Sequence, residues 1–189
     1  MVRLFIALDI EPAAVERLRP ALDFLSRYQS ILKTVEPENF HITLKFLGEC
    51  GAGLADDVER GFAALEPPCG AVPYELKRLG AFPGIDRASV LWCGVRADEA
   101  MVRGMFEAIE RFTTALGFAP DKRGFTPHVT LARVRKGMKV TAPVVDYVQK
   151  NADTGYGASE FGSITLYSSL LTPRGPVYTP LQKIILPGK

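Results

Sequence analysis

The segment HITL at His41 to Leu44 returns later in the chain as HVTL at His128 to Leu131, and these are the only two histidines among 189 residues. With ordinary use of Thr and Leu, chance produces this repeat on the order of once in 10^4 sequences. In a strand, alternate side chains share a face, so each motif places its His and Thr on one face and its apolar residues on the other. We therefore expect two strands that each present an imidazole beside a hydroxyl.

The elements around these motifs follow from apolar periodicity and from turn residues. The second motif strand begins with an extended segment, because Pro127 disfavours helical backbone at the residue before it. Asp98 is a predicted helix N-cap, and Gly48 and Gly117 are predicted stops. Predicted strands or extended segments cover 2–9, 31–35, 41–47, 72–79, 88–95, 126–134, 161–171 and 177–186, the last two as a hairpin, and predicted helices cover 12–28, 53–65, 98–116 and 143–150.

The order of these elements is mixed, which favours an α+β fold with antiparallel sheets over a doubly wound parallel sheet. The order strand, helix, HxTL strand, helix occurs twice. This repeat predicts one domain, residues 1–189, made of two pseudo-twofold-related lobes with flanking helices around a central cleft.

Composition excludes several classes of protein. A hydrophobic fraction of 47% excludes disorder, and a net charge of +2 suits a small anionic ligand without demanding nucleic acid. We expect a soluble, cytoplasmic protein, because acidic residues interrupt the apolar start MVRLFIALDIEP and no stretch reaches the roughly 20 apolar residues of a membrane span. Three cysteines are widely spaced, which is typical of ordinary reduced thiols. Glycine-rich nucleotide-binding loops are absent from the sequence.

Two imidazoles and two hydroxyls suit phosphoryl transfer without a metal. One imidazole accepts a proton from water while the other donates a proton to the leaving oxygen, and Thr43 and Thr130 hold the nonbridging oxygens. A metal site is the competing interpretation, but H-x-T is neither HExxH nor H-x-H, and two histidines need further ligands from distant positions.

Further candidate residues flank the motifs. The fork of Arg133 suits phosphate, although strict alternation turns this side chain away from His128 unless a twist or bulge follows Leu131. Lys45 shares the His41 face of an ideal strand, where it meets either a phosphate or solvent. Phe125, like Phe40 and Phe46, either stacks a base or belongs to the core.

Five stretches carry a resemblance to a known family: RLFIALD, PENFHITLKFLGE, GAFP, VLWCGV and FTPHVTLARV. Together they resemble the RNA 2',3'-cyclic phosphodiesterases of the two-histidine phosphoesterase superfamily, also called 2'-5' RNA ligases. The resemblance runs from Val2 to Val134 and more loosely to the C-terminus. The paired HxTL motifs are its specific part.

The resemblance implies a bilobal α+β fold and hydrolysis of a terminal 2',3'-cyclic phosphate to a 2'-phosphomonoester, with no cofactor and no metal. It places catalysis on His41 and His128 and phosphate binding on Thr43, Thr130 and Arg133. It also implies that His128 activates water and that His41 protonates the departing 3' oxygen, an assignment that the near-symmetric motifs themselves leave open. The reverse reaction joins a cyclic phosphate end to a 5'-hydroxyl as a 2'-5' linkage without ATP.

The implied partner is RNA with a 2',3'-cyclic phosphate end, such as a tRNA fragment or short oligonucleotide, or a cyclic nucleotide, and we expect a monomer. Two alternatives stay open. One is a non-catalytic RNA-end binding module, which rests on the basic residues around the second motif, namely Lys122, Arg123, Arg133, Arg135, Lys136 and Lys139. The other is a related phosphodiesterase that acts on 2'-5' oligonucleotides or on a cyclic phosphate of ADP-ribose.

Overall fold

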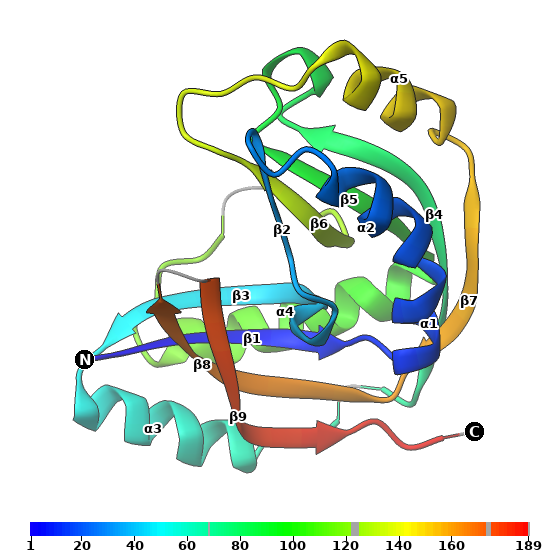
Figure 1. Ribbon diagram of the computed structural model, residues 1–189. Coiled ribbons are helices and arrows are strands. Elements are labelled where there is room, and N and C mark those ends of the chain that lie inside the picture. The colour runs from blue at the N-terminus through cyan, green and yellow to red at the C-terminus, as the bar shows by residue number, and fades with distance from the viewer. Residues whose placement is uncertain (68, 122–124, 173–174, 189) are drawn as a thin grey trace.

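Two antiparallel sheets form the framework of the computed structural model, which describes residues 1–67, 69–121, 125–172 and 175–188 (Figure 1). The first sheet has four strands in the order β3-β1-β8-β9, and the second has five in the order β2-β6-β5-β4-β7. One motif strand lies in each sheet. The prediction of an α+β fold with antiparallel sheets is confirmed.

The strands are β1 (Val2–Asp9), β2 (Leu32–Thr34), β3 (His41–Cys50), β4 (Val72–Phe82), β5 (Val90–Ala97), β6 (His128–Val134), β7 (Gly155–Phe161), β8 (Ser163–Thr172) and β9 (Gly175–Ile185). The helices are α1 (Pro12–Arg17), α2 (Arg19–Ser26), α3 (Ala52–Ala63), α4 (Glu99–Ala115) and α5 (Ala142–Lys150), with short 3-10 turns at Pro37–Asn39 and Ile85–Arg87. The predicted hairpin is the β8–β9 pair.

Local chemistry explains where the elements begin and end. Asp98 caps α4 by accepting a hydrogen bond from the Met101 backbone N–H at 3.0 Å, as predicted. Gly117, just beyond α4, has a φ of 90°, a left-handed conformation that favours glycine. The prediction that Gly48 stops a strand is wrong, because β3 continues through this residue to Cys50.

Two other predicted elements differ in the structure. The single helix expected over 12–28 is divided into α1 and α2 at Leu18, since Pro20 has no backbone N–H to continue the helical hydrogen bonds. The strand β7 was not predicted. Its sequence GYGASEF lacks an apolar alternation because it is an edge strand with mostly exposed side chains.

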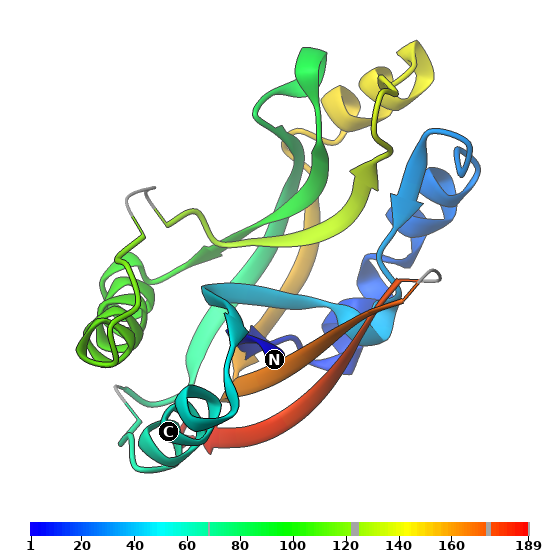
Figure 2. The ribbon, with the colours of Figure 1, turned by 90° about the vertical axis from the view of Figure 1, so that its left-hand side faces the viewer.

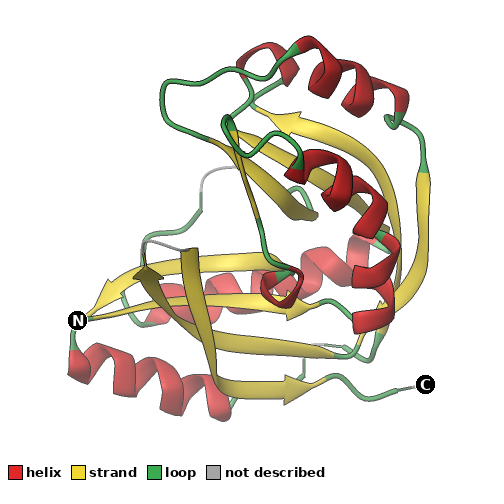
Figure 3. Ribbon diagram, viewed as in Figure 1, coloured by secondary structure: helices red, strands yellow, loops and turns green. Residues whose placement is uncertain are grey.

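The helices lie on the outside of the two sheets (Figure 3). The four-stranded sheet packs against α3 and α4, and the five-stranded sheet packs against α1, α2 and α5. Each repeat is followed by a strand that joins the sheet of the other repeat. β4 follows the first repeat and pairs with β5 of the second. β8 follows the second repeat and pairs with β1 of the first. One continuous apolar cluster, with residues from both sheets, fills the interior.

Across the described residues, no helix combines the length and the apolar character that a membrane crossing requires.

Candidate active site

The two HxTL motifs have the alternation that the sequence predicts. Ile42 and Leu44 are buried in β3, while His41 and Thr43 are only partly covered. In β6, Val129 and Leu131 are buried, and His128 and Thr130 are partly covered in the same way. The two motif strands come from different sheets and lie beside each other in Figure 2, β3 in cyan-blue and β6 in yellow-green.

Both imidazoles are held by the same backbone contact. His41 Nδ1 lies 2.7 Å from the Asn39 carbonyl oxygen, and His128 Nδ1 lies 2.7 Å from the Thr126 carbonyl oxygen. A carbonyl only accepts hydrogen bonds, so each Nδ1 must donate its proton. Each neutral ring therefore keeps the lone pair of Nε2 for chemistry, and His41 Nε2 lies 3.1 Å from the Thr43 hydroxyl.

Arg133 lies on the same face as His128 because a β-bulge interrupts β6. Thr130 pairs with Trp92 and Ala132 pairs with Leu91, so Leu131 is the extra residue. The bulge shifts the alternation by one residue, which buries Ala132 and turns Arg133 toward the open face. The sequence required a twist or bulge after the motif for Arg133 to face the same side as His128, and this bulge is present.

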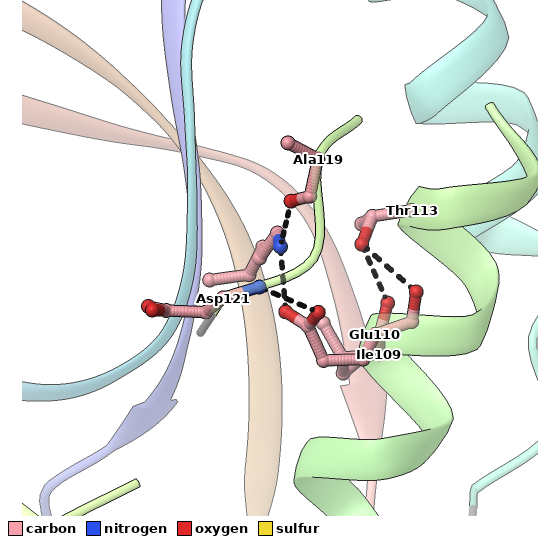
Figure 4. Close-up of polar contacts among 6 residues, drawn as sticks. Ile109, Glu110, Thr113, Ala119 and Asp121 are labelled. Atoms are coloured by element: carbon pink, nitrogen blue, oxygen red, sulfur yellow. Dashed lines mark hydrogen bonds and ion pairs between the residues drawn. The ribbon is translucent and has the colours of Figure 1, made fainter. Parts of the chain in front are cut away.

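Lys45 does not share the face of His41, so the predicted placement is wrong. A matching bulge at Leu44 in β3 turns this side chain into the interior, where it is 5% exposed. Its amine lies 2.6 Å from a Glu110 carboxylate oxygen and donates to the Ala119 carbonyl at 2.7 Å. Figure 4 shows Glu110 in the C-terminal part of α4 and Ala119 on the segment that follows this helix, with the Asp121 backbone N–H donating to the second Glu110 oxygen.

The three phenylalanines take different places. Phe40 belongs to the buried core. Phe46 is 58% exposed and lines the cleft described below. Phe125 stacks on Phe106 of α4 at a ring-centroid distance of 5.0 Å and lies outside that cleft. The candidate stacking residue that the structure brings to His41 is therefore Phe46 rather than Phe125.

A cleft of about 930 Å³ brings His41, Thr43, Thr130 and Arg133 together. We call it the main cleft. His128 precedes Thr130 by two residues on the same face of β6, and protonation of His128 would oppose protonation of His41. Residues that the sequence did not single out also line the main cleft: Arg3, Phe5, Lys33 and Tyr178. None of them belongs to an HxTL motif, although Arg3 and Phe5 lie in the RLFIALD stretch. The pairing of β1, β2 and β9 with other strands brings them to the site.

Aromatic rings enclose both histidines. Tyr178 meets the His41 ring edge-on at a centroid distance of 5.3 Å, and Phe5 lies 4.9 Å from it. Phe82 meets the His128 ring edge-on at 4.9 Å. These rings cover part of each imidazole, while the Thr43 hydroxyl and Arg133 share the main cleft with His41.

This enclosure controls protonation. Burial lowers the pKa of His41 to about 4, and the charges of Arg133 and His128 act in the same direction against the Asn39 carbonyl and Asp9. Burial also lowers the pKa of His128, again with a contribution from Arg133. Both rings of the free protein are therefore neutral at pH 7. A bound phosphate anion favours the protonated forms.

A carboxylate network lies behind His41. Asp9 is directly opposite His41 in the β1–β3 register and accepts hydrogen bonds from Ser163, Thr165 and Tyr167 at 2.6 to 2.8 Å. Lys183 completes the network with an ion pair of 2.9 Å. Burial opposes ionisation of Asp9, but these hydrogen bonds lower its pKa overall.

Among the described residues, the other candidate groups do not line the main cleft. None of the cysteines lines it, and burial raises the pKa of the Cys93 thiol to about 12. Within the described ranges, no group of three or more His, Cys, Asp and Glu side chains is arranged to hold a metal ion. Of the basic segment, Lys122 and Arg123 lie outside the described residues, and the Arg135 guanidinium donates to the Gln29 carbonyl at 2.8 Å.

Comparison with known proteins places this site in a family. The family model described as LigT like phosphoesterase matches residues 8–92 and 97–178. The chain belongs to the LigT-like phosphoesterases. An RNA 2',3'-cyclic phosphodiesterase of Aeropyrum pernix is 38% identical over 90% of this chain and 95% of its own length. A protein of the same name from Archaeoglobus fulgidus is 34% identical over 96% and 98%.

Solved structures share the fold of this chain. A protein of Thermus thermophilus superposes with a TM-score of 0.80 at 25% identity, covering 99% of both chains. Escherichia coli LigT in complex with 3'-AMP has a TM-score of 0.74 at 21% identity, covering 98% of both chains. The family resemblance that the sequence motifs indicated is confirmed, and the chain is an enzyme of the phosphoesterase class.

Proposed function

We propose that this protein hydrolyses the 2',3'-cyclic phosphate at the end of an RNA to a 2'-phosphomonoester, without a metal ion. The observation that carries the proposal is the matched pair of imidazoles, each with Nδ1 fixed by a carbonyl two residues earlier. The relatives of 38% and 34% identity, both named as RNA 2',3'-cyclic phosphodiesterases, support the choice of substrate.

The two rings supply a complete acid and base pair. Nε2 of one neutral ring takes a proton from water while the water oxygen bonds to phosphorus. As the bond from phosphorus to O3' breaks, the other ring, as imidazolium, donates its Nε2 proton to O3'. One water is consumed, and the phosphate remains on O2'. The next cycle begins after the proton returns between the rings through solvent.

We assign the base to His128 and the acid to His41. This is the assignment that the family resemblance implies. Burial lowers the pKa of His41 to about 4 in the free protein, so the bound phosphate anion must favour the protonated ring that donates to O3'. In this assignment the leaving O3' lies beside Nε2 of His41, and the attacking water lies beside Nε2 of His128.

The nonbridging oxygens need partners as negative charge develops. The hydroxyls of Thr43 and Thr130 point to the same face as the imidazoles, and the Arg133 fork offers two parallel N–H donors. Preorganised donors of this kind stabilise the transition state more than the ground state, because their orientation is fixed before charge develops.

We propose that the same site also joins RNA ends, with a 5'-hydroxyl as the nucleophile. A 5'-hydroxyl in place of water attacks the cyclic phosphate, and His128 accepts its proton as before. The product is a 2'-5' phosphodiester, and no ATP is consumed, because the strained cyclic ester supplies the driving force. Incubating cyclic-phosphate and 5'-hydroxyl oligonucleotides together and digesting the product with a nuclease specific for 3'-5' linkages tests this step.

A substrate panel tests the hydrolysis. Adenosine 2',3'-cyclic phosphate, a 2'-5' oligoadenylate and the cyclic phosphate of ADP-ribose are each incubated with the enzyme, and the phosphate position in the product is determined by ³¹P NMR. We expect turnover of the 2',3'-cyclic phosphate to the 2' product. Tight binding without turnover establishes a binding module instead, and exclusive turnover of either other compound overturns the choice of substrate.

A further inference from the structure

A second cavity of about 750 Å³ lies beyond His128, between the start of α4 and the strands β4 and β5. Its volume is typical of small-ligand sites. Within the described residues, it has no lining residue in common with the main cleft. Nothing in the proposed chemistry at His41 and His128 uses it.

The segment that carries His128 joins the two cavities. Thr126 and Pro127 line the second cavity, Thr130 and Arg133 line the main cleft, and His128 stands between them in the chain. Gly94 of β5 pairs with His128 and therefore shares its face of the sheet. Arg96, two residues after Gly94, lies on the same face. A ligand that passes His128 therefore continues onto Arg96.

Arg78 lines the second cavity and has a backbone conformation that few residues other than glycine adopt. It is the extra residue of a bulge in β4, with a φ of 62°. Its guanidinium lies 5.3 Å from the centre of the Trp92 ring, which in turn lies 6.3 Å from the His128 ring. A Cβ on Gly94 would stand 2.9 Å from the Lys77 carbonyl oxygen and 3.1 Å from two atoms of the Arg78 side chain, so glycine permits the close approach of β4 and Arg78 to β5 at this point.

This geometry prepares Arg78 to bind an anion. Stacking on the indole fixes the plane of the guanidinium, and its N–H donors remain at the exposed rim. Left-handed backbone at a residue other than glycine persists only where surrounding contacts enforce it, and it gathers at binding sites. The Arg78 backbone N–H is held by the Thr154 carbonyl at 2.7 Å.

The remaining lining combines positive charge with aromatic surface. Four basic side chains face two acidic ones: Lys77, Arg78, Arg96 and Arg103 against Glu99 and Glu107. Glu99 is ion-paired with Arg103, which leaves an excess of positive charge on the side of β4 and β5. The stacked Phe106 and Phe125 rings form an apolar wall. Cations beside an aromatic wall are the pattern that binds single-stranded nucleic acid.

We propose that the second cavity binds the nucleotide that precedes the cyclic phosphate in an RNA chain, with its phosphate on Arg78 and Arg96 and its base against the Phe106–Phe125 wall. The inference rests on the proposed function and narrows its substrate to an RNA end rather than a free cyclic nucleotide. A mononucleotide has no group for this cavity.

The test compares adenosine 2',3'-cyclic phosphate with a tetra-adenylate that ends in the same cyclic phosphate. We expect kcat/KM to be at least about tenfold higher for the tetranucleotide. Arg78→Met and Arg96→Met should each lower the ratio of the two kcat/KM values by about tenfold, since one charge-assisted hydrogen bond to phosphate is removed. The slope of log kcat/KM against log salt should become shallower by about 0.7 for each arginine that no longer neutralises a phosphate.

Arg60→Met is the matched control, because Arg60 is exposed on α3 and lines neither cavity. The ratio of kcat/KM for the tetranucleotide to kcat/KM for the mononucleotide should be the same in Arg60→Met as in the wild type. Equal kcat/KM for the two substrates in the wild type overturns the inference, as does an unchanged ratio in both cavity variants. If the wild type turns over neither substrate, the proposed function fails. Fluorescence anisotropy with a labelled 2'-phosphorylated tetra-adenylate then tests the second cavity separately. The inference predicts weaker binding of this oligonucleotide to Arg78→Met and Arg96→Met than to the wild type, and equal binding overturns it.

Discussion

Leu44 and Leu131 are the extra residues of two β-bulges at the same position of the two HxTL motifs. Each bulge turns the third residue after the motif threonine back to the histidine face, Phe46 in β3 and Arg133 in β6. The pseudo-twofold repeat therefore extends to backbone irregularities, while the chemistry at the equivalent positions differs. One motif adds an aromatic ring to the cleft and the other adds a positive charge.

Arg133→Met should lower kcat/KM for a 2',3'-cyclic phosphate by about 10²- to 10³-fold, because a preorganised donor to the developing charge is lost. Stability should change little, since this side chain is exposed. Steady-state kinetics and chemical denaturation measure the two effects. Lys136→Met serves as the control for loss of a nearby positive charge. A loss below about tenfold in Arg133→Met, or an equal loss in the control, contradicts the assigned role.

The two histidines should titrate below the ordinary value of about 6.5. Burial lowers the pKa of His41 to about 4 and also lowers that of His128. With only two histidines in the chain, ¹H–¹⁵N spectra of the imidazoles give two titrations, assigned by single His→Asn variants. Adding 2'-AMP should raise both pKa values, because an anion favours the cationic rings. A ring that titrates at or above 6.5 in the free protein refutes the account of burial.

Lys45→Met should destabilise the protein by about 3 kcal/mol and leave kcat close to the wild-type value. The substitution leaves the mostly buried Glu110 carboxylate without its ion-pair partner, and breaking such a pair is more costly than never forming it. Guanidinium denaturation and steady-state turnover, both below the unfolding temperature, separate the effects. The double variant with Glu110→Gln should recover part of the loss. Wild-type stability together with a large fall in kcat would show that Lys45 acts in the active site, contrary to its buried position.

Asp9→Asn should lower stability at pH 7 by roughly 2 kcal/mol, because three hydroxyl donors and Lys183 lose a charged partner. The pKa of Asp9 is lowered in the folded protein, so its contribution is present above the unfolded value of 3.8 and is lost as the pH falls below it. Denaturation midpoints measured from pH 7 to pH 3 should therefore converge for the wild type and the variant. A constant difference over this range excludes ionisation of Asp9 as the cause.

The sequence predicted those parts of the site that depend on regular periodicity. Alternation in a strand placed His41 with Thr43 and His128 with Thr130, and the structure has this arrangement. Alternation failed at Lys45, because a bulge inserts one residue and reverses the facing of the residues that follow, as far as the next irregularity at Leu47. For Arg133 the same irregularity was recognised as a requirement, since the arginine otherwise had no explanation.

The remaining differences come from long-range packing. The interruption at Pro20 was visible in the sequence, but the apolar face continues from α1 to α2 and favoured a single helix. β7 has no pattern of its own and exists because β4 offers an unpaired edge. Tyr178 and Phe5 reach His41 only after β1 pairs with β3 and β8. The β8–β9 hairpin that carries Tyr178 was predicted, but no local pattern specifies the pairing of β1 with β3 and β8.

The most direct test of the two-histidine mechanism is turnover of an RNA 2',3'-cyclic phosphate in excess chelator by the wild type, His41→Ala and His128→Ala. We predict full wild-type turnover after removal of metal ions and a loss of at least about 10²-fold in each variant, as expected when a general acid or base is removed. Circular dichroism confirms that the variants fold. Loss of wild-type activity in chelator, or wild-type turnover in either histidine variant, would contradict the mechanism.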